Sequence, residues 1–313
     1  MPLSGFQDLC DSIAELAGTG APQAVMRGPH AQAATMDLRG VAITAVCMPA
    51  AGTSQAVLTA PMETPIHHDG DAAAAWLALL DANSVLPDLD SPRFARNPLT
   101  GDVVMLWPCP LQDMTPLSAY QRATHMADVV LHWQRHRVVH PELLSPGRGG
   151  ARGVLHDTDA ALDAAWRFRD LYLALCDVVG QPAQPGPPDT GAFSFALQFQ
   201  EVEVVMAHLP RLRPHVALVG VPLGRREPGE QAQAEALAMM EANFALAGQP
   251  HGAAFSRDPA SGELLLRYAY PLEGACGRHC LAQMASLAAF AREWVASLTP
   301  PRSATPRLDP VHA

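Results

Sequence analysis

The sequence lacks lysine altogether, and all 21 of its basic residues are arginines. Acidic residues outnumber them at 31, which gives the chain a formal charge of −10. Surfaces that bind nucleic acids or anionic membranes need clustered positive charge, so this balance argues against both classes of partner. Charged residues make up only 17% of the 313-residue chain and hydrophobic residues 49%. The chain therefore has ample apolar material for a folded core, at a length typical of two domains.

Other features are also absent. No apolar run approaches the roughly 20 residues that a membrane-spanning helix needs. The first residues carry Asp8, Asp11 and Glu15 instead of the basic stretch of a secretory signal. The six cysteines include no C-x-x-C pair, which is typical of reduced thiols in a cytoplasm. We therefore expect a cytoplasmic protein.

An internal repeat organises the chain. Residues 94–105, FARNPLTGDVVM, align with residues 255–266, FSRDPASGELLL, which lie 161 positions later. Further pairs at this offset, or one residue less, are Pro110 and Pro271, Trp133 and Trp294, and Asn83 and Asn243. One offset held over about 40 residues indicates a duplicated domain.

The aligned segments predict the same local structure. Asn97-Pro98 and Asp258-Pro259 each place a side-chain acceptor before a proline of fixed φ, and a glycine ends each turn. Because apolar stretches flank both turns, each reads as a β-hairpin. Alternation over residues 193–199, with shifted parity from Val202 onward, predicts two more strands with a tight turn or a bulge near residues 200–201.

The same reading applied to both halves predicts the order α-β-β-β-α-β-β-α twice. Strands grouped with helices on one side favour an α+β fold with antiparallel sheets over a parallel α/β fold. We expect helices near 116–137 and 278–298 to close the two halves, with Trp133 and Trp294 buried at equivalent positions. The predicted organisation is a first repeat over 1–140, a Pro- and Gly-rich linker over 141–157, a second repeat over 158–299 and a disordered tail over 300–313.

One motif resembles a known family. Residues 240–248, MEANFALAG, followed by GAAFSRDPASGE at 252–263, are similar to the core motif of class I type III secretion chaperones, the Tir-chaperone (CesT-like) family. The α-β-β-β-α-β-β-α order is the fold of that family. The first half resembles a more divergent copy, in which Ser84 stands where the second half has Phe244.

The resemblance implies a function. Members of this family bind the N-terminal segment of a secreted effector and hold it extended, which can use strand addition at a sheet edge and apolar side chains in surface grooves. The implied partners are therefore a secreted effector and, as a second candidate, the secretion ATPase. Eight apolar residues of helices and hairpins are the expected groove positions: Leu9, Ile13, Val103, Met105, Phe168, Leu175, Leu264 and Leu266.

The resemblance also bears on assembly. Single-domain relatives usually form homodimers through one patch used twice. Two copies of that patch on one chain, joined by a short linker, predict a monomer that acts as a pseudo-dimer.

We expect no catalytic residues, cofactor or metal. His125, His132, His136 and His140 share one helix face, but a solvated polar face explains them better than a metal site, since no carboxylate or cysteine lies at ligand spacing. Cys276, His279 and Cys280, the loop pair His67-His68, and Glu201 with Glu203 are likewise more simply structural. Two alternatives remain open at this point: a metal-dependent or small-molecule enzyme on a duplicated α+β scaffold that uses the histidine face, and a regulatory protein that has lost its clients.

Overall fold

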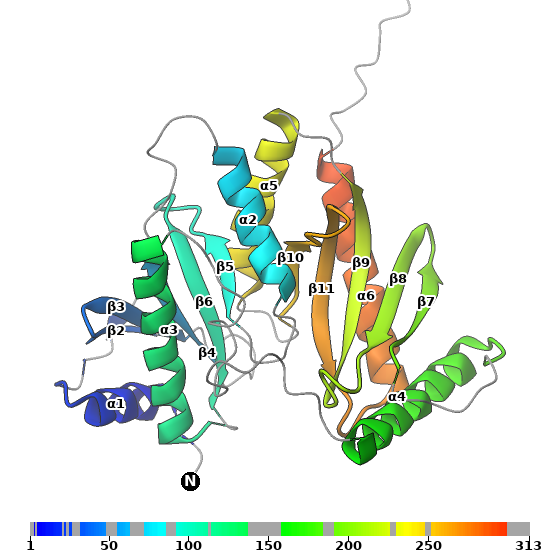
Figure 1. The fold of residues 1–313 in the computed structure, drawn as a ribbon, viewed down its shortest axis with the longest axis horizontal. Helices are drawn as coiled ribbons and strands as arrows, with labels where there is room; N and C mark the ends of the chain where they lie inside the picture. Colours follow the sequence, from blue (N-terminus) through cyan, green and yellow to red (C-terminus); the bar gives the residue numbers. More distant parts are fainter. Residues whose placement is uncertain are drawn as a thin grey trace, which may run out of the picture.

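Two antiparallel sheets, one in each half of the chain, form the framework of the protein (Figure 1). The computed structural model describes residues 3, 5–20, 22, 25–26, 32–47, 55–62, 72–85, 92–111, 114–136, 158–183, 191–225, 230–247 and 252–298. The expected linker over 141–157 and the expected tail over 300–313 lie outside these residues. No helix of the described part is both long and apolar enough to cross a membrane.

The elements of the first half follow the predicted order with one addition, the two-residue strand β1. They are α1 (Phe6–Ala17), β1 (Val25–Met26), β2 (Gln32–Leu38), β3 (Val41–Cys47), β4 (Gln55–Met62), α2 (Ala72–Val85), β5 (Arg93–Arg96), β6 (Val103–Pro110) and α3 (Pro116–His136).

The second half repeats this order without the extra strand. Its elements are α4 (Thr158–Val179), β7 (Phe193–Phe199), β8 (Val202–His208), β9 (Val216–Arg225), α5 (Glu230–Leu246), β10 (Ala254–Arg257), β11 (Glu263–Pro271) and α6 (Gly277–Leu298).

The two sheets have the same strand order. The first runs β1-β2-β3-β4-β6-β5 and the second, read from its other end, runs β7-β8-β9-β11-β10. Each sheet therefore ends on one side with its short strand, β5 or β10, and on the other with the strand that follows the first helix. This identity of order confirms the tandem α+β fold that the repeat predicted.

The first hairpins of the two halves also match residue by residue. In β2–β3 the closing pair is Leu38 and Val41, and in β7–β8 it is Phe199 and Val202, 161 positions later. Arg39 and Gln200, at the same offset, both have positive φ, 56° and 55°, in the two-residue turns. The parity change in the sequence at residues 200–201 is thus a tight turn.

Helices cover one face of each sheet. In the first half α1 packs against α3, and α3 packs against β3, β4 and β6. In the second half α4 packs against α6, which lies on β8, β9 and β11. Most of the buried apolar side chains of both halves belong to one continuous cluster, and a second, smaller cluster lies where the halves meet.

A buried asparagine ties the second helix of each half to the short edge strand of its own sheet. The side-chain amide of Asn83, on α2, donates to the Phe94 carbonyl (2.9 Å) and accepts from the Phe94 N–H (2.8 Å). Asn243, on α5, makes the same two bonds with Phe255, at 3.0 and 2.6 Å. These bonds satisfy backbone groups on the outer sides of β5 and β10, where no neighbouring strand supplies partners in the described part of the chain.

The two tryptophans of the closing helices differ in burial. Trp133 is buried, as predicted, with 4% of its surface exposed. Trp294 is only partly buried and stacks on Phe255 with 4.6 Å between ring centroids. Trp294 therefore occupies the equivalent place on its closing helix and packs against the core, with more of its surface exposed than Trp133.

Replacing Asn243 tests the role of this clamp. Asn243→Ala would leave the buried N–H and C=O of Phe255 without their partner, which we expect to cost about 2–4 kcal/mol of unfolding free energy. Urea denaturation followed by circular dichroism measures this cost. The control is Asn97→Ala. The Asn97 side chain accepts from the N–H of exposed Leu99, where water can replace it. A loss of unfolding free energy in Asn243→Ala no larger than in Asn97→Ala would contradict the role of the asparagine.

Candidate partner-binding surface

The halves meet along a seam formed by α2 and β5 of the first half and α5 and β10 of the second. In Figure 1, α2 and α5 lie side by side between the two sheets, and they are in contact. Each helix also packs on the other half's edge strand, α2 on β10 and α5 on β5. This exchange of equivalent contacts is the arrangement expected of a pseudo-dimer within one chain.

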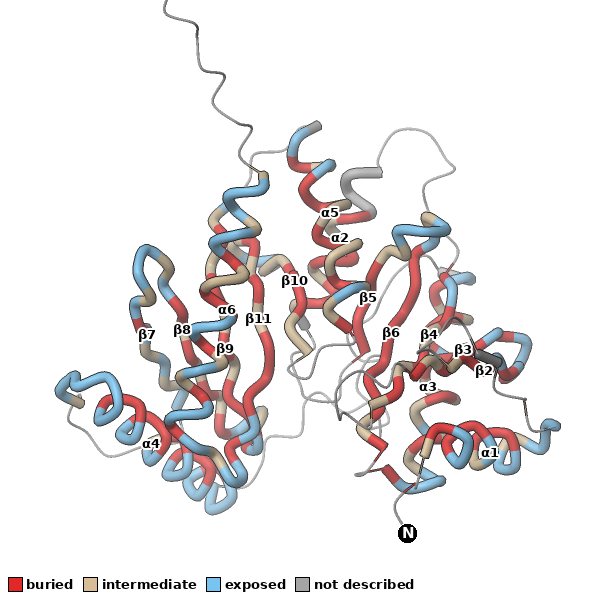
Figure 2. The backbone as a smooth tube through the Cα atoms, turned by 180° about the vertical axis from the view of Figure 1, so that it is seen from behind, coloured by how far each residue is buried: buried red, intermediate tan, exposed pale blue. Residues whose placement is uncertain are grey.

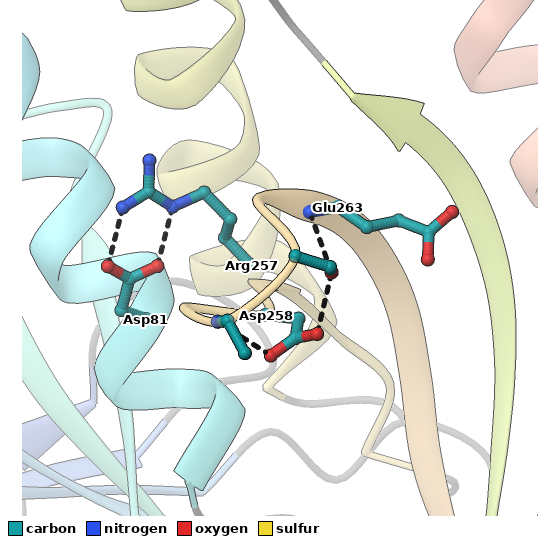
Figure 3. A network of polar contacts seen from close by, with 6 residues as sticks. Asp81, Arg257, Asp258 and Glu263 are labelled. Carbon is teal, nitrogen blue, oxygen red and sulfur yellow. Dashed lines mark hydrogen bonds and ion pairs between the residues drawn. The ribbon is translucent and has the colours of Figure 1, made fainter.

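Two ion pairs cross the seam at equivalent positions. Arg257 of β10 makes a bidentate pair with Asp81 of α2, with both N–O distances at 2.6 Å (Figure 3). Arg96 of β5 pairs with Glu241 of α5. Arg96 and Arg257 are 161 positions apart, and Asp81 and Glu241 are 160 apart. The repeat thus supplies each half with an arginine that binds an acid on the other half's helix.

The seam is nevertheless asymmetric in its core. On one side Phe244 of α5 and Ala247, the residue after the helix, pack against Ala95, Val104 and Leu106 of the first sheet. At the positions equivalent to Phe244 and Leu106, the other side has Ser84 and Arg267. The Arg267 guanidinium donates to the carbonyls of Asn83 and Ser84 at the end of α2. A cation at a helix C-terminus is favourable, so an apolar contact on one side is matched by a polar cap on the other.

A further arginine crosses the seam into a space left by a glycine. Arg93 of β5 is buried and donates to the Ala253 carbonyl at 3.3 Å. A Cβ at Gly252 would collide with this guanidinium, and Gly252 has a positive φ of 55°. Burial lowers the pKa of Arg93 to about 10, so this side chain stays charged at neutral pH.

The eight apolar residues expected to line client grooves are all buried. Leu9, Ile13, Val103, Met105, Phe168, Leu175, Leu264 and Leu266 are each between 0% and 4% exposed. They belong to the continuous core beneath the helices, because their alternation places them on the inner faces of α1, α4, β6 and β11. A partner could reach them only if a covering helix moved, and contact with a client stays a prediction for these positions.

The outer side of β7, which we call the β7 edge, is the open edge of the second sheet. Within the described residues β7 ends the sheet and pairs with β8 alone. The pair beside a two-residue turn is hydrogen bonded, and such pairs alternate along antiparallel strands. Counting from Phe199, the N–H and C=O groups of Ser194, Ala196 and Gln198 therefore point away from β8. All three residues are exposed.

An aromatic cluster lies beside this edge, under α4. Phe193 and Phe195 of β7 are only partly buried, and they contact Phe168 and Tyr172 of α4. The Tyr172 ring lies 5.5 Å from Phe193 and 4.8 Å from Phe195, and the Phe168 ring lies 5.8 and 5.9 Å from the same two. The edge therefore offers unsatisfied backbone groups together with accessible aromatic surface.

The outward face of α4 is also partly apolar. Leu162, Trp166 and Leu173 are 38%, 50% and 41% exposed and follow helical spacing. In Figure 2 the outer side of α4 is largely exposed, whereas its inner side is buried. The apolar surface near the β7 edge thus extends onto the helix.

A buried histidine lies at the inner end of the cluster. His208 pairs with Phe193 in the sheet, is 1% exposed, and its ring lies 4.9 Å from that of Phe168. Burial lowers the pKa of His208 to about 4, although the backbone at Pro214 and Arg213 opposes the shift. This imidazole is therefore neutral at pH 7.

The other side chains considered from the sequence do not form a reactive centre in the described part of the chain, where no three His, Cys, Asp or Glu residues come together as a metal site. His125 is partly buried and packs edge-on against Trp107, with 5.6 Å between the rings. His132 is partly buried, while His140 and the pair His67-His68 lie outside the described residues.

Cys276 is exposed at the start of α6, where backbone N–H groups of His279 and Arg278 lower its pKa, and Cys280 is buried. Glu201 and Glu203 are exposed on the β7–β8 hairpin.

Sequence reasoning placed the candidate residues on the first helix and the hairpin of each half and missed the β7 edge. One signal was available: the positions that hold Phe193, Phe195 and Phe199 in the second half hold Gln32, Ala34 and Leu38 in the first. Aromatic residues at three alternate positions of one copy are more than a core strand of this fold needs.

Comparison with known families places the second half. Residues 193–295 match the model of the Tir chaperone protein (CesT) family. The match begins at the first residue of β7 and ends within α6, so it contains the β7 edge, α5 and the seam residues of β10.

Two similar solved structures align to this chain with low TM-scores. The ExoT–SpcS complex from Pseudomonas aeruginosa is 22% identical over 41% of this chain and 96% of that chain, with a TM-score of 0.29. The HopA1–SchA chaperone–effector complex is 12% identical over 41% of this chain and 88% of that chain, with a TM-score of 0.28. A search of curated proteins finds no match.

A double-mutant cycle on Arg257 and Asp81 tests the seam. Because the pair is bidentate and partly buried, we expect a coupling of about 1–2 kcal/mol between Arg257→Ala and Asp81→Ala in unfolding free energy. The matched control is the exposed Arg167–Asp163 pair within α4, for which about 0.2–0.5 kcal/mol is expected. Equal couplings at the two sites would show that the seam pair contributes nothing beyond a surface contact.

The buried His208 predicts a pH-dependent stability. The unfolded chain binds a proton near pH 6.5 and the folded chain only near pH 4, so stability is full above pH 6.5 and falls as the pH drops towards 4. Between pH 7.5 and 5 the wild type should lose about 2 kcal/mol more unfolding free energy than His208→Leu. Urea titrations at the two pH values measure the difference. His215→Gln, at an exposed histidine of the next loop, serves as the control and should behave as wild type; an identical pH dependence in His208→Leu would refute the assignment.

Proposed function

We propose that this protein is a type III secretion chaperone that binds the N-terminal segment of a secreted effector in the cytoplasm and holds it extended and competent for export. The match of residues 193–295 to the Tir chaperone family carries this proposal. The effector would then pass to the secretion ATPase, which is the second partner of the proposal. Holding a chain extended requires binding surface and no catalytic step.

The surface of the second half suits such a client. An extended segment can satisfy its own backbone groups by adding to an open sheet edge while alternate side chains fill apolar surface. The β7 edge provides exposed backbone positions at Ser194, Ala196 and Gln198, with partly exposed aromatic rings beside them. The net charge of −10 favours clients with basic segments, because complementary charge speeds and orients association.

The proposed active form is the monomer. The seam already brings α2 and α5 together and places each on the other half's edge strand. This occupies the surfaces through which two separate copies would otherwise pair. One chain therefore supplies the arrangement that single-domain members of the family build from two.

Purification from cells that carry a secretion system tests the proposal. Light scattering of the chain alone should give a mass near 33.3 kDa, since the seam is satisfied internally. In secreting cells the tagged chain should co-purify with a secreted protein, and removing the N-terminal segment of that protein should abolish both the complex and its export. The matched control removes a segment of equal length from its C-terminal half. A complex that survives loss of the N-terminal segment, or a stable dimer of the chain alone, would be inconsistent with the proposal.

A further inference from the structure

The described part of the chain forms two sheets with four outer edges, which are not equally available. Two of them, the outer sides of β5 and β10, face the seam. There Asn83 and Asn243 bond the backbone of Phe94 and Phe255, and the helices α5 and α2 of the opposite halves pack on these strands. An added strand has no access to either edge.

The third edge is the outer side of β2, equivalent to the β7 edge in the first half. The chain's own strand β1 occupies part of it, with Val25 paired to Ala33 and Met26 to Gln32. Ala33 is consequently buried, whereas its counterpart Ser194 on β7 is exposed. Beyond β1 the outward positions are Thr35 and Asp37, and the Asp37 carboxylate accepts the Gly40 N–H. A short covering strand and a charge are both devices that discourage strand addition.

The fourth edge, at β7, has neither device among the described residues. Its outward positions Ser194, Ala196 and Gln198 are uncharged and exposed, at the places of Ala33, Thr35 and Asp37 in the first half. The aromatic surface follows the same asymmetry. Cys10 and Ala34 stand where α4 and β7 have Tyr172 and Phe195, as the matching hairpins and the matching helix C-caps at Gly18 and Gly180 show.

We infer that the two halves divide their roles, so that each chain receives a single client strand, at the β7 edge, while β1 closes the equivalent edge of the first half. This rests on the proposed function and adds where the client binds and in what number. A chaperone built from two identical subunits offers two equal edges, whereas this chain offers one.

The edge also defines the kind of segment that fits. Side chains that point to the α4 side of an added strand would meet Phe193, Phe195 and Tyr172, so large apolar residues suit those alternate positions. The residues between them would lie on the opposite face, near exposed Glu203, which neighbours Gln198 in the sheet, and close to Glu201 in the turn. Arginine or lysine suits positions at that end of the strand. The client segment is thus an alternating apolar and basic or polar strand.

Equivalent substitutions on the two edges test this inference in the full-length chain. Ala196 and Thr35 are both exposed outward positions, 161 residues apart. A proline there removes an outward N–H without breaking the sheet's own ladder, so both variants should fold, which circular dichroism and thermal melting verify. Ala196→Pro should lower the amount of client captured in secreting cells about tenfold, and Thr35→Pro should change it by less than about twofold.

A photo-cross-linking amino acid at each of the two positions identifies the contact directly. We expect a cross-link to the client from position 196 and none from position 35, one client per chain by native mass spectrometry, and a cross-linked segment that alternates apolar with polar or basic residues.

Other outcomes overturn the inference in distinguishable ways. The inference would be overturned by a cross-link from position 35, by equal effects of the two prolines, or by two clients per chain. Each of these outcomes would show that both halves bind client strands. A complex that neither proline weakens and neither position cross-links would place the client elsewhere, with the chaperone function intact. If the wild-type chain captures no client, the proposed chaperone function itself is contradicted.

Discussion

The exchange of helices across the seam is the constraint on which the rest of the structure depends. Each sheet ends in a four-residue strand, β5 or β10, that is too short to protect its own backbone. A helix from the other half covers that strand, and an asparagine from its own half bonds its outer backbone groups. Neither half is complete without the other, and the ion pairs of Arg96 and Arg257 link the same elements. The seam therefore decides which edges are buried and which remain at the far ends of the molecule.

Covering β5 and β10 leaves the opposite ends of the two sheets, where β1 partly covers β2 in the first half and β7 is uncovered among the described residues of the second. An open edge is a hazard to a folded protein because it can pair with any extended chain. For a chaperone of extended clients the same property is the working surface. The β7 edge, with exposed backbone groups next to aromatic rings, has the features that the proposed strand-binding site requires.

Duplication within one chain allows changes that a symmetric dimer cannot make. In a homodimer a substitution on the shared patch appears twice, whereas here Phe244 and Leu106 pack on one side while Ser84 and Arg267 meet on the other. The apolar pair Phe244 and Leu106 and the capping pair Ser84 and Arg267 are each stable combinations. Exchanging one member between them would bury an arginine against a phenyl ring. The same freedom extends to β2 and β7, which share a register but not their side chains.

The sequence by itself determined the repeat and the order of elements, and it carries the resemblance to the Tir chaperone family. Local rules suffice for these, because the proline-glycine turns, the alternating strands and the helical spacing depend on neighbours in the chain. The motif at residues 240–263 also identified the fold of the second half. The predicted bounds of the two closing helices, 116–137 and 278–298, agree with those of α3 and α6 to within one residue.

Only the tertiary structure decided which residues of that fold are accessible. Periodicity shows that Leu9, Met105 or Leu266 faces one side of its element, and it cannot show whether another layer covers that side. Whether a strand lies at an edge depends on sheet order, which joins segments far apart in the chain, so the open side of β7 and the closure of β2 by β1 were invisible in the sequence. The pairing of Arg257 with Asp81, 176 positions apart, likewise exists only because two halves fold against each other.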